Sequence, residues 1–505
     1  MDEVIVHIGA VITIRASALT DEASKTLQAR LTHRNPEHER AMRFSKARAR
    51  TIPQVLRFFD QLQGNIVIPR GALSLVRDVL RQHRLTPVYR TDGVVSRSEG
   101  CVAVSDLNVE LRAYQLDALR AMVERRQGII QMPCGSGKTT TAAAAMLSTG
   151  EPGLVLVHTH DIADQWAETI ERLTFDRPRM VTGKDPRTFA ALKPGEIAVA
   201  MVQTLTKKPA RAEPLLGSVG AFITDECHHV PARTWRAVAD RCPARFRWGL
   251  TATPDRSDGL GYVQHLLMGP TVYRITTTRL IEEGFLQSPT IIPVDSGWAP
   301  GEQHHRTTTR CPACNRSVKV PNPAAHRATG TPCAGCGFRC SSREPLEIGP
   351  LDYTRALSDA SKDAGRLGLC RSLAVTAHND GRSILVLVPR RPAVRAIACM
   401  LSDAGVPSVA VTGDTHKAER QERLERARTG EVRAVVATQL ADEGLDLPAL
   451  DCAINMSAGK SAGRARQRIG RTLRIDGKPP VVFEMVDGGK FLDQWRTRAA
   501  AYRSE

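Results

Sequence analysis

The architecture follows from one segment, Gly128-Ile129-Ile130-Gln131-Met132-Pro133-Cys134-Gly135-Ser136-Gly137-Lys138-Thr139-Thr140. An apolar, strand-like run passes into a glycine-rich loop, and an alanine-rich helical run follows it. Small residues let backbone N–H groups curl around a phosphate, and the start of a helix adds partial positive charge. Lys138 can reach the β- and γ-phosphates, and the Thr139 hydroxyl can hold Mg²⁺. We therefore predict a nucleoside-triphosphate site lined by Pro133, Cys134, Gly135, Ser136, Gly137, Lys138, Thr139 and Thr140, although Met132 stands where the strict motif has glycine.

Continuous apolar runs alternate with helical stretches around and beyond this loop. We expect a first series of strands at residues 128–132, 154–157, 197–202, 221–224 and 248–251. We expect a second series at residues 384–388, 408–411, 434–437, 452–454 and 481–485. Continuous apolar strands separated by helices indicate a parallel sheet that is covered on both faces. The sequence therefore predicts an α/β protein with two parallel-sheet domains in tandem.

Two further regions precede and separate these series. Residues 1–105 combine short strand-like runs with a helix-like stretch at 73–83, which predicts a small N-terminal α+β domain. Residues 289–350 are rich in Pro, Cys, His and Gly, which indicates a connector with an insertion. The expected domains are therefore 1–105, 106–285, 286–350 and 351–505, with the insertion at about 306–342.

An acidic pair follows the fourth strand of the first series, in the segment Phe222-Ile223-Thr224-Asp225-Glu226-Cys227-His228-His229. A phosphate-loop ATPase needs a carboxylate at such a strand end to hold Mg²⁺, and Asp225 suits that role. Glu226 can polarise the attacking water. The alternatives are a solvated strand end or a metal site built from Cys227 and the two histidines. The phosphate-binding loop upstream favours nucleotide chemistry over both.

Five of the twelve cysteines fall within residues 311–340. Cys311 and Cys314 form one C-x-x-C pair, and Cys333 and Cys336 form a second. Two such pairs can place four thiolates around Zn²⁺, so we predict an inserted structural zinc ribbon. The alternative is a redox or disulfide pair, and we expect Cys340 and His326 outside the ligand set. Basic residues nearby suggest that the ribbon grips nucleic acid or a partner; they are Arg306, Arg310, Arg316, Lys319 and Arg327.

The whole chain of 505 residues carries 70 Lys+Arg against 53 Asp+Glu, a formal net charge of +17. Such an excess suits a polyanion such as nucleic acid, although a basic proteome would give it too. Aromatic residues make up 4%, which disfavours a single-strand binder built mainly on base stacking. No apolar run approaches about 20 residues, and the first residues lack the basic region of a signal peptide. We expect a cytoplasmic protein of a bacterium or phage-infected cell, associated with the nucleoid.

The order of the remaining motifs resembles the DEAD/DEAH-box helicases of superfamily 2. Asp-Glu-Cys-His at 225–228 resembles their signature motif, and Tyr114-Gln115 resembles the glutamine motif on the adenine side. Residues 249–254 are similar to motif III, 437–446 to motif V and 467–474 to motif VI. The segment at 251–259, TATPDRSDG, is similar to the XPB-like branch, which includes UvsW-type phage helicases. The resemblance covers about residues 108–490 and implies two RecA-like domains with ATP and Mg²⁺ in the cleft between them.

The resemblance also implies roles for single residues. It places catalysis on Lys138, Asp225, Glu226, Gln467, Arg471 and Arg474, with Thr139 and Asp225 on Mg²⁺ and the two arginines as fingers for the γ-phosphate. Further ATP contacts fall on Tyr114, Gln115, Gly444 and Asp446. Contacts to the nucleic-acid backbone fall on Thr159, Gln165, Thr204 and Thr438. The sequence departs from the pattern at His158-Thr159-His160 and at Gly365-Arg366, which weakens the transfer of roles there.

The predicted function is an ATP-dependent DNA helicase or translocase that acts on duplex, branched or single-stranded DNA, in repair, recombination or phage metabolism. One alternative is an RNA helicase. Another is the motor subunit of a restriction or defence complex, whose nuclease would be a separate chain because no nuclease motif is recognisable. A third is a non-enzymatic zinc-ribbon protein that binds nucleic acid. Protein partners are expected to bind through the N-terminal domain or the ribbon.

Overall fold

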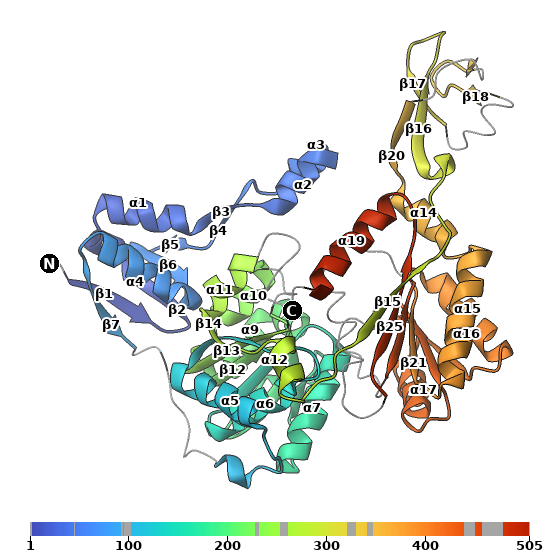
Figure 1. The fold of residues 1–505 in the computed structure, drawn as a ribbon. Coiled ribbons are helices and arrows are strands. Elements are labelled where there is room, and N and C mark those ends of the chain that lie inside the picture. The colour runs from blue at the N-terminus through green and yellow to red at the C-terminus, as the bar shows by residue number, and fades with distance from the viewer. Residues whose placement is uncertain are drawn as a thin grey trace. The chain divides into compact units, whose positions relative to one another are not determined.

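The computed structural model describes residues 3–44, 46–91, 94, 103–227, 232–252, 261–320, 330–340, 347–438, 450–456 and 478–503. The chain divides into two compact units, Met1–Phe285 and Leu286–Glu505 (Figure 1). Each unit contains one of the two expected parallel sheets. None of the described helices is long and apolar enough to span a membrane.

The first unit begins with a five-stranded sheet in the order β5-β6-β2-β1-β7. Only β1 and β7 pair in parallel, and the other pairs are antiparallel. Alternate residues of β1 are buried, so one face of the sheet forms a core with helices α1 and α4. The strands are β1 (Glu3–Ile8), β2 (Val11–Arg15), β5 (Asp60–Leu62), β6 (Asn65–Pro69) and β7 (Thr86–Arg90); the helices are α1 (Asp21–Arg30) and α4 (Leu73–Gln82). These elements confirm the predicted N-terminal α+β fold.

A smaller part of the N-terminal region lies outside that sheet. Strand β3 (Thr32–Arg34) pairs antiparallel with β4 (Val55–Arg57), and the helices α2 (Pro36–Phe44) and α3 (Lys46–Ala49) lie between them in the chain. The ring of His33 in β3 stacks on Tyr262, with ring centroids 3.9 Å apart. This pair therefore joins the N-terminal region to the part of the unit that carries the parallel sheet.

The parallel sheet of the first unit has seven strands in the order β10-β11-β9-β12-β13-β8-β14. All its pairs are parallel. The strands are β8 (Gln127–Gln131), β9 (Gly153–Val157), β10 (Arg179–Val181), β11 (Ile197–Met201), β12 (Ala221–Thr224), β13 (Phe246–Thr251) and β14 (Thr271–Arg274). The helices are α5 (Ala113–Arg125), α6 (Lys138–Ser148), α7 (His160–Thr174), α8 (Val202–Lys207), α9 (Pro209–Ser218), α10 (Ala232–Ala239), α11 (Gly261–Met268) and α12 (Thr277–Glu282). All five predicted strands of the first series are confirmed.

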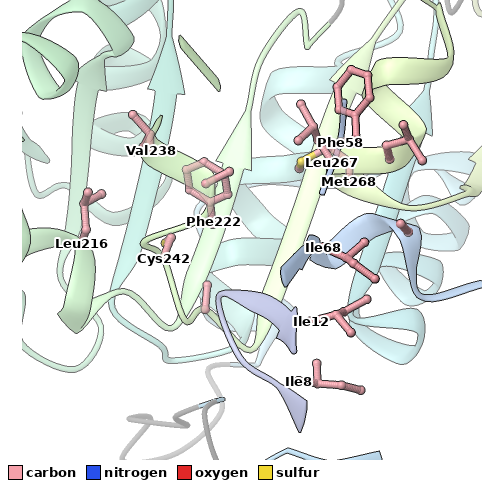
Figure 2. Close-up of a cluster of buried hydrophobic side chains, with 14 of the residues drawn as sticks. Ile8, Ile12, Phe58, Ile68, Leu216, Phe222, Val238, Cys242, Leu267 and Met268 are labelled. Carbon is pink, nitrogen blue, oxygen red and sulfur yellow. The ribbon is translucent and has the colours of Figure 1, made fainter. Parts of the chain in front are cut away.

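The N-terminal sheet packs directly against this parallel sheet. Figure 2 shows Ile12, Ile68 and Phe58 of the N-terminal region in the same apolar cluster as Phe222 and Met268. The backbones also approach closely, because a Cβ added to Gly71 would lie 2.5 Å from the carbonyl carbon of Leu267. The two sheets therefore share one hydrophobic core.

Two buried arginines reinforce this contact from opposite sides. Arg70, in the short helix η2 (Arg70–Ala72), donates a 2.5 Å hydrogen bond to the carbonyl oxygen of Ala244. Arg247, in β13, donates to the carbonyl oxygen of Ala10 at 3.1 Å. Burial and the nearby Arg247 charge lower the pKa of Arg70 to about 9. Each part of the unit thus supplies one guanidinium to the backbone of the other.

The second unit contains a six-stranded parallel sheet in the order β15-β25-β24-β21-β23-β22. The strands are β15 (Thr290–Asp295), β21 (Ile384–Leu387), β22 (Ser408–Val411), β23 (Ala434–Ala437), β24 (Cys452–Asn455) and β25 (Val481–Val486). The helices are α14 (Tyr353–Ala360), α15 (Ala364–Asn379), α16 (Arg391–Asp403), α17 (Lys417–Arg428) and α19 (Lys490–Arg503). Alternate residues of β21 belong to two separate cores, one on each face. The second predicted series is confirmed, and the stretch expected as a connector adds the edge strand β15.

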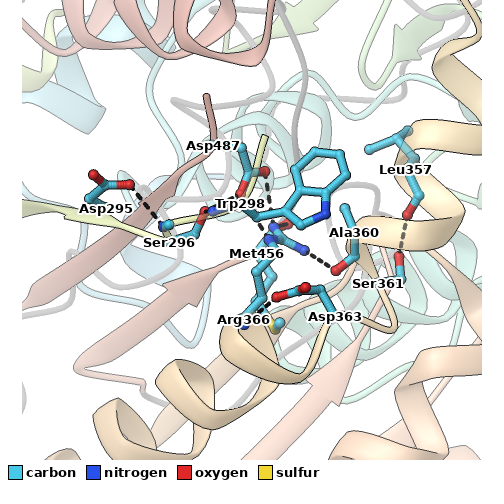
Figure 3. Close-up of polar contacts among 11 residues, drawn as sticks. Asp295, Ser296, Trp298, Leu357, Ala360, Ser361, Asp363, Arg366, Met456 and Asp487 are labelled. Carbon is cyan, nitrogen blue, oxygen red and sulfur yellow. Dashed lines mark hydrogen bonds and ion pairs between the residues drawn. The ribbon is translucent and has the colours of Figure 1, made fainter. Parts of the chain in front are cut away.

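Arg366 ties the ends of several of these elements together (Figure 3). Its guanidinium makes two hydrogen bonds to the Asp487 carboxylate, at 2.8 and 3.2 Å. It also donates to the carbonyl oxygens of Ala360 at 2.7 Å and Met456 at 2.8 Å. Ser296 donates its hydroxyl to the same carboxylate at 2.5 Å. The residue that departs from the family pattern is therefore a buried structural clamp within the second unit.

The predicted insertion forms two small antiparallel sheets. Strands β16 (His305–Arg310), β17 (Ser317–Val320) and β20 (Glu347–Leu351) make one sheet in the order β17-β16-β20. Strands β18 (Thr331–Pro332) and β19 (Arg339–Cys340) make the other. The C-x-x-C pairs lie in the turns between β16 and β17 and between β18 and β19. This arrangement fits the expected zinc ribbon.

Candidate active site and metal centre

The glycine-rich loop lies between β8 and α6, as the sequence predicts. Gly135 and Gly137 adopt φ angles of 81° and 74°, in the left-handed region that favours glycine. A Cβ added to Gly137 would lie 2.3 Å from the side-chain nitrogen of Gln115, so a larger residue would displace that side chain. Lys138 is the first residue of α6, and its backbone belongs to the open N-terminal turn of that helix. The loop can therefore receive an anion at the helix start.

The ammonium of Lys138 faces the two predicted carboxylates. It donates to Glu226 Oε1 at 2.8 Å and lies 3.7 Å from Asp225 Oδ1. Burial alone would lower the pKa of Lys138, but the Glu226 and Asp225 charges outweigh it and raise the pKa. Burial raises the pKa of Asp225 despite the attraction of Lys138. The single ammonium of Lys138 thus faces the two carboxylates of Asp225 and Glu226. Carboxylate oxygens with an excess of negative charge fit a hard divalent cation such as Mg²⁺.

The backbone at Glu226 is unusual. Its φ angle is 45°, although it is neither glycine nor asparagine. Strained residues of this kind gather at functional sites, where the surrounding structure holds them in place. Here the Glu226 N–H donates to Asp225 Oδ1 at 2.9 Å, and the next residue, Cys227, donates its N–H to Leu250 in the neighbouring strand. The turn therefore directs both carboxylates toward Lys138.

The side chains of Tyr114 and Gln115 form hydrogen bonds with the backbone of the phosphate-binding loop. The Tyr114 hydroxyl and the Gln115 amide both donate to the carbonyl oxygen of Ser136, at 2.9 and 3.0 Å. Phe285 packs edge-on against Tyr114, with centroids 4.9 Å apart, and Arg112 lies 5.1 Å over the Phe285 ring. Sequence reasoning missed Phe285, because no local motif links it to Arg112 and Tyr114 so far away in the chain.

Trp166 is a further contact that sequence reasoning missed. Its indole N–H donates to Asp225 Oδ2 at 2.9 Å, and the whole side chain is buried. Trp166 lies on α7, 59 positions before Asp225. The only local signal is its place on the apolar face of a helix, which is equally typical of an ordinary core residue.

Three of the predicted nucleic-acid contacts lie near two neighbouring strand ends. Thr159 follows β9 and caps α7, where its hydroxyl accepts the Ile162 N–H at 3.4 Å. Gln165 is half-buried one to two turns further along α7, and Thr204 is half-buried in α8, which follows β11. Strands β9 and β11 are paired, so these segments are adjacent. Thr438 follows β23 in the second unit and is buried.

The other predicted residues lie outside the described part of the chain. They are Gly444, Asp446, Gln467, Arg471 and Arg474, together with His228, His229 and His326. Their assigned roles remain predictions.

The four cysteines of the ribbon converge on one point. Their Sγ atoms all lie within 4.8 Å of one another. The Cys311–Cys336 and Cys314–Cys333 sulfur pairs are each 3.6 Å apart, close to the ~3.8 Å edge of a tetrahedron with Zn–S bonds of about 2.3 Å. Cys340 is buried beside them but is not one of the four. The donor set and its spacing therefore fit Zn²⁺.

The two cysteine turns share one backbone design. Asn315 donates its N–H to the Cys311 carbonyl oxygen, and Gly337 donates to that of Cys333, both at 2.8 Å. Asn315 and Gly337 each adopt a left-handed φ, 55° and 75°. Asparagine and glycine tolerate this conformation best. The repeated turn explains how both pairs present their sulfurs to a common centre.

Comparison with known proteins places both sheets in one family. One family model, described as "Type III restriction enzyme, res subunit", matches residues 108–256, and another, "Helicase conserved C-terminal domain", matches residues 367–476. The DNA 3'-5' translocase XPB2 of Sulfurisphaera tokodaii is 29% identical over 389 residues, or 75% of this chain and 82% of that protein. The DNA 3'-5' helicase XPB of Kineococcus radiotolerans is 27% identical over 399 residues, or 77% of this chain and 62% of that longer protein.

A solved structure shows the same fold. The DUF1998 helicase MrfA, bound to DNA and AMPPNP, superposes with a TM-score of 0.53 at 15% identity, covering 81% of this chain and 54% of that one. The two family models match different parallel sheets, and together they span about half of the chain. The relatives align over three quarters of this chain. The chain therefore belongs to the superfamily 2 helicases of the XPB type.

Proposed function

We propose that this protein is an ATP-dependent DNA helicase or translocase. The observation that carries the proposal is the position of the Lys138 ammonium between the Glu226 and Asp225 carboxylates, at the start of α6. The printed names of the two relatives, a DNA 3'-5' translocase and a DNA 3'-5' helicase, favour DNA over RNA as the track. Movement in the 3'-to-5' direction is part of the same proposal.

The residues of the first sheet would divide the work of phosphoryl transfer. Mg²⁺, when bound, would neutralise charge that develops on the phosphates. Thr139 and Asp225 would hold it, and Lys138 would leave its carboxylate partners to contact the β- and γ-phosphates. Glu226 would accept a proton from the attacking water. Arg471 and Arg474, on the other RecA-like domain, are proposed to reach the γ-phosphate when ATP draws the two domains together.

DNA would be held mainly through its phosphates. Thr159 and Thr204, at neighbouring strand ends, would supply hydroxyl and backbone donors that ignore base sequence. Thr438 would do the same in the second domain. The net charge of +17 would add a sequence-independent attraction that weakens as salt rises. The N-terminal domain, fixed to the first parallel sheet by Arg70 and Arg247, is proposed to extend this DNA surface.

ATP hydrolysis measured with single-stranded DNA, duplex DNA, forked DNA and RNA tests this function. We expect the DNA substrates to stimulate turnover and RNA to have little effect. Glu226→Gln should lower turnover by about 10²- to 10⁴-fold, because it removes the proposed base, while ATP binding persists. Glu168→Gln, on the exposed face of α7, is the matched control and should keep full activity. Turnover near wild type in Glu226→Gln would remove Glu226 from the role of base, and stimulation by RNA alone would favour the RNA helicase.

The restriction or defence motor is a second candidate, favoured by the description of the family model that matches residues 108–256. Such a motor would hydrolyse ATP on duplex DNA without separating the strands. A strand-separation assay with forked DNA, run beside the ATPase assay, distinguishes the two. Release of a single strand supports the helicase, and duplex-stimulated turnover without release supports the motor.

We further propose that Cys311, Cys314, Cys333 and Cys336 bind one structural Zn²⁺. Metal analysis of the purified protein should find about one zinc per chain. Cys314→Ser with Cys333→Ser should lose that zinc, whereas Cys399→Ser, an exposed cysteine on α16, should retain it. Zinc retained in the double variant would contradict the assignment. If the zinc is lost and DNA affinity does not fall, the ribbon does not grip DNA.

A further inference from the structure

The side chain of Trp166 makes one polar contact, and that contact is to a catalytic candidate. Its indole N–H lies 2.9 Å from Asp225 Oδ2, and the exposed fraction of the side chain is 0%. A buried indole N–H needs an acceptor, and a carbonyl oxygen usually suffices. Trp248, another fully buried tryptophan of this unit, donates to the Met122 carbonyl oxygen, also at 2.9 Å. Trp166 differs because its acceptor is an ionisable group beside the phosphate-binding loop.

The contacts of Asp225 show what the indole does to the carboxylate. Oδ2 accepts from Trp166, whereas Oδ1 accepts the Glu226 backbone N–H at 2.9 Å and faces Lys138 Nζ at 3.7 Å. A carboxylate can rotate about its terminal bond unless hydrogen bonds fix it. Here the Trp166 N–H binds Oδ2 and the Glu226 N–H binds Oδ1, so the plane of the Asp225 carboxylate is fixed. Oδ1 remains on the side of the loop where the nucleotide is proposed to bind.

Carboxylates that bind metals are commonly oriented by such outer contacts, and their loss typically lowers metal affinity by about 10- to 100-fold. The donor here is well suited to this task. The indole ring cannot exchange with water, because it is packed in the core, and its N–H can only donate. Its position on α7 is also fixed by apolar neighbours of the same helix face, Ile162, Ala163 and Ile170.

We propose that Trp166 is a positioning residue for Mg²⁺-dependent nucleotide binding, acting through the orientation of the Asp225 carboxylate. This inference rests on the proposed ATPase function. The effect of Trp166 is specific to the metal-bound nucleotide, since the phosphate-binding loop and Lys138 do not contact the indole through any hydrogen bond in the described structure.

The test compares Trp166→Phe with Trp248→Phe in the full chain. Both changes keep an aromatic ring and remove one buried indole N–H from the same unit. Binding of a fluorescent ATP analogue is titrated with Mg²⁺, and again in excess chelator. We expect Trp166→Phe to raise the Mg²⁺ concentration for half-maximal binding about 10-fold. Binding in chelator should match wild type, and Trp248→Phe should match wild type in both titrations.

A second variant separates the N–H from the packing of the ring. Benzothienylalanine at position 166, introduced by suppression of a stop codon, keeps the fused-ring shape and replaces the N–H by sulfur. It should reproduce the Mg²⁺ shift even if Trp166→Phe fails to fold. An unchanged Mg²⁺ dependence in this variant would overturn the inference, as would an equal shift in Trp248→Phe.

The outcomes also separate this inference from the function beneath it. If the wild-type protein binds the analogue without any dependence on Mg²⁺, the proposed ATPase site fails and the role of Trp166 fails with it. If wild type depends on Mg²⁺ and the position-166 variants match it, only the role of Trp166 is lost.

Discussion

Each unit has a buried aspartate directly after a strand of its parallel sheet. Asp225 directly follows β12, and Asp487 directly follows β25, and both strands belong to parallel sheets. Their exposed fractions are 5% and 4%. Asp487 faces the guanidinium of Arg366 in a pair with balanced charge. Asp225 and Glu226 instead share the single ammonium of Lys138. An acid at a strand end is therefore not by itself a metal ligand, and the balance of charge around it distinguishes a clamp from a site.

The two arrangements differ in what they leave for a ligand. Arg366 directs four hydrogen bonds at Asp487, Ala360 and Met456, so its donors are committed to the protein (Figure 3). In the first unit the carboxylates outnumber the ammonium, and burial raises the pKa of Asp225. A raised pKa for a carboxyl means that its ionised form is disfavoured in the fold. The ATP site thus holds an excess of negative charge that a bound Mg²⁺ can neutralise.

The largest expected effect comes from breaking the clamp. Asp487→Asn leaves the Arg366 charge buried without its counter-ion, which should destabilise the second unit by about 3–5 kcal/mol. Hydrogen exchange in the full chain, followed in peptides from α15 and β25, measures this loss. Asp493→Asn, in an exposed pair with Arg496, is the control and should cost less than about 1 kcal/mol. If the amide hydrogens of α15 and β25 exchange at the same rate in Asp487→Asn and Asp493→Asn, the Arg366–Asp487 pair does not stabilise the second unit.

A smaller effect is expected from Ser296→Ala. The Ser296 hydroxyl donates to Asp487 Oδ1 at 2.5 Å, and a hydrogen bond to a charged group contributes about 1.5–3 kcal/mol. We expect a loss near the lower end, because Arg366 continues to hold the carboxylate. Ser361→Ala is the matched control, since that buried serine donates to the neutral Leu357 carbonyl oxygen at 2.6 Å and should cost about 1 kcal/mol. Hydrogen exchange in the peptides from α15 and β25 measures the loss of stability in both serine variants. A greater loss in Ser361→Ala than in Ser296→Ala would contradict the argument that the charged acceptor strengthens the Ser296 hydrogen bond.

The sequence predicts the parallel sheets well because their central strands are continuous apolar runs. The strands that it missed, β10, β14 and β15, lie at sheet edges and carry more polar residues. Within the site, the loop and the acidic pair are local motifs and were predicted. The Trp166–Asp225 contact and the Arg366–Asp487 pair join positions 59 and 121 apart. A local sequence pattern cannot predict either contact, because the partners are far apart in the chain. Trp166 and Arg366 each lie on a helix, and nothing next to them in the sequence indicates the aspartate that they contact.

The smallest expected change has the opposite sign. Asp225→Asn makes the same substitution as Asp487→Asn, also at the end of a parallel strand, but it removes a charge that burial disfavours and leaves Lys138 in a balanced pair with Glu226. The asparagine carbonyl oxygen can accept from the Trp166 N–H in place of Oδ2, but the Glu226 backbone N–H then loses the acceptor that Oδ1 provides, which offsets part of the gain. We expect a net gain of at most about 1 kcal/mol in the first unit together with loss of ATP hydrolysis, since stabilising single substitutions commonly add about 0.5–2 kcal/mol and cost function where an active site is destabilised. Hydrogen exchange in α6 and β12 measures the gain, with Asp117→Asn in an exposed pair with Arg120 as the neutral control. A loss of stability at Asp225 would show that Lys138 needs both carboxylates, and that the site is a balanced clamp like that of Asp487.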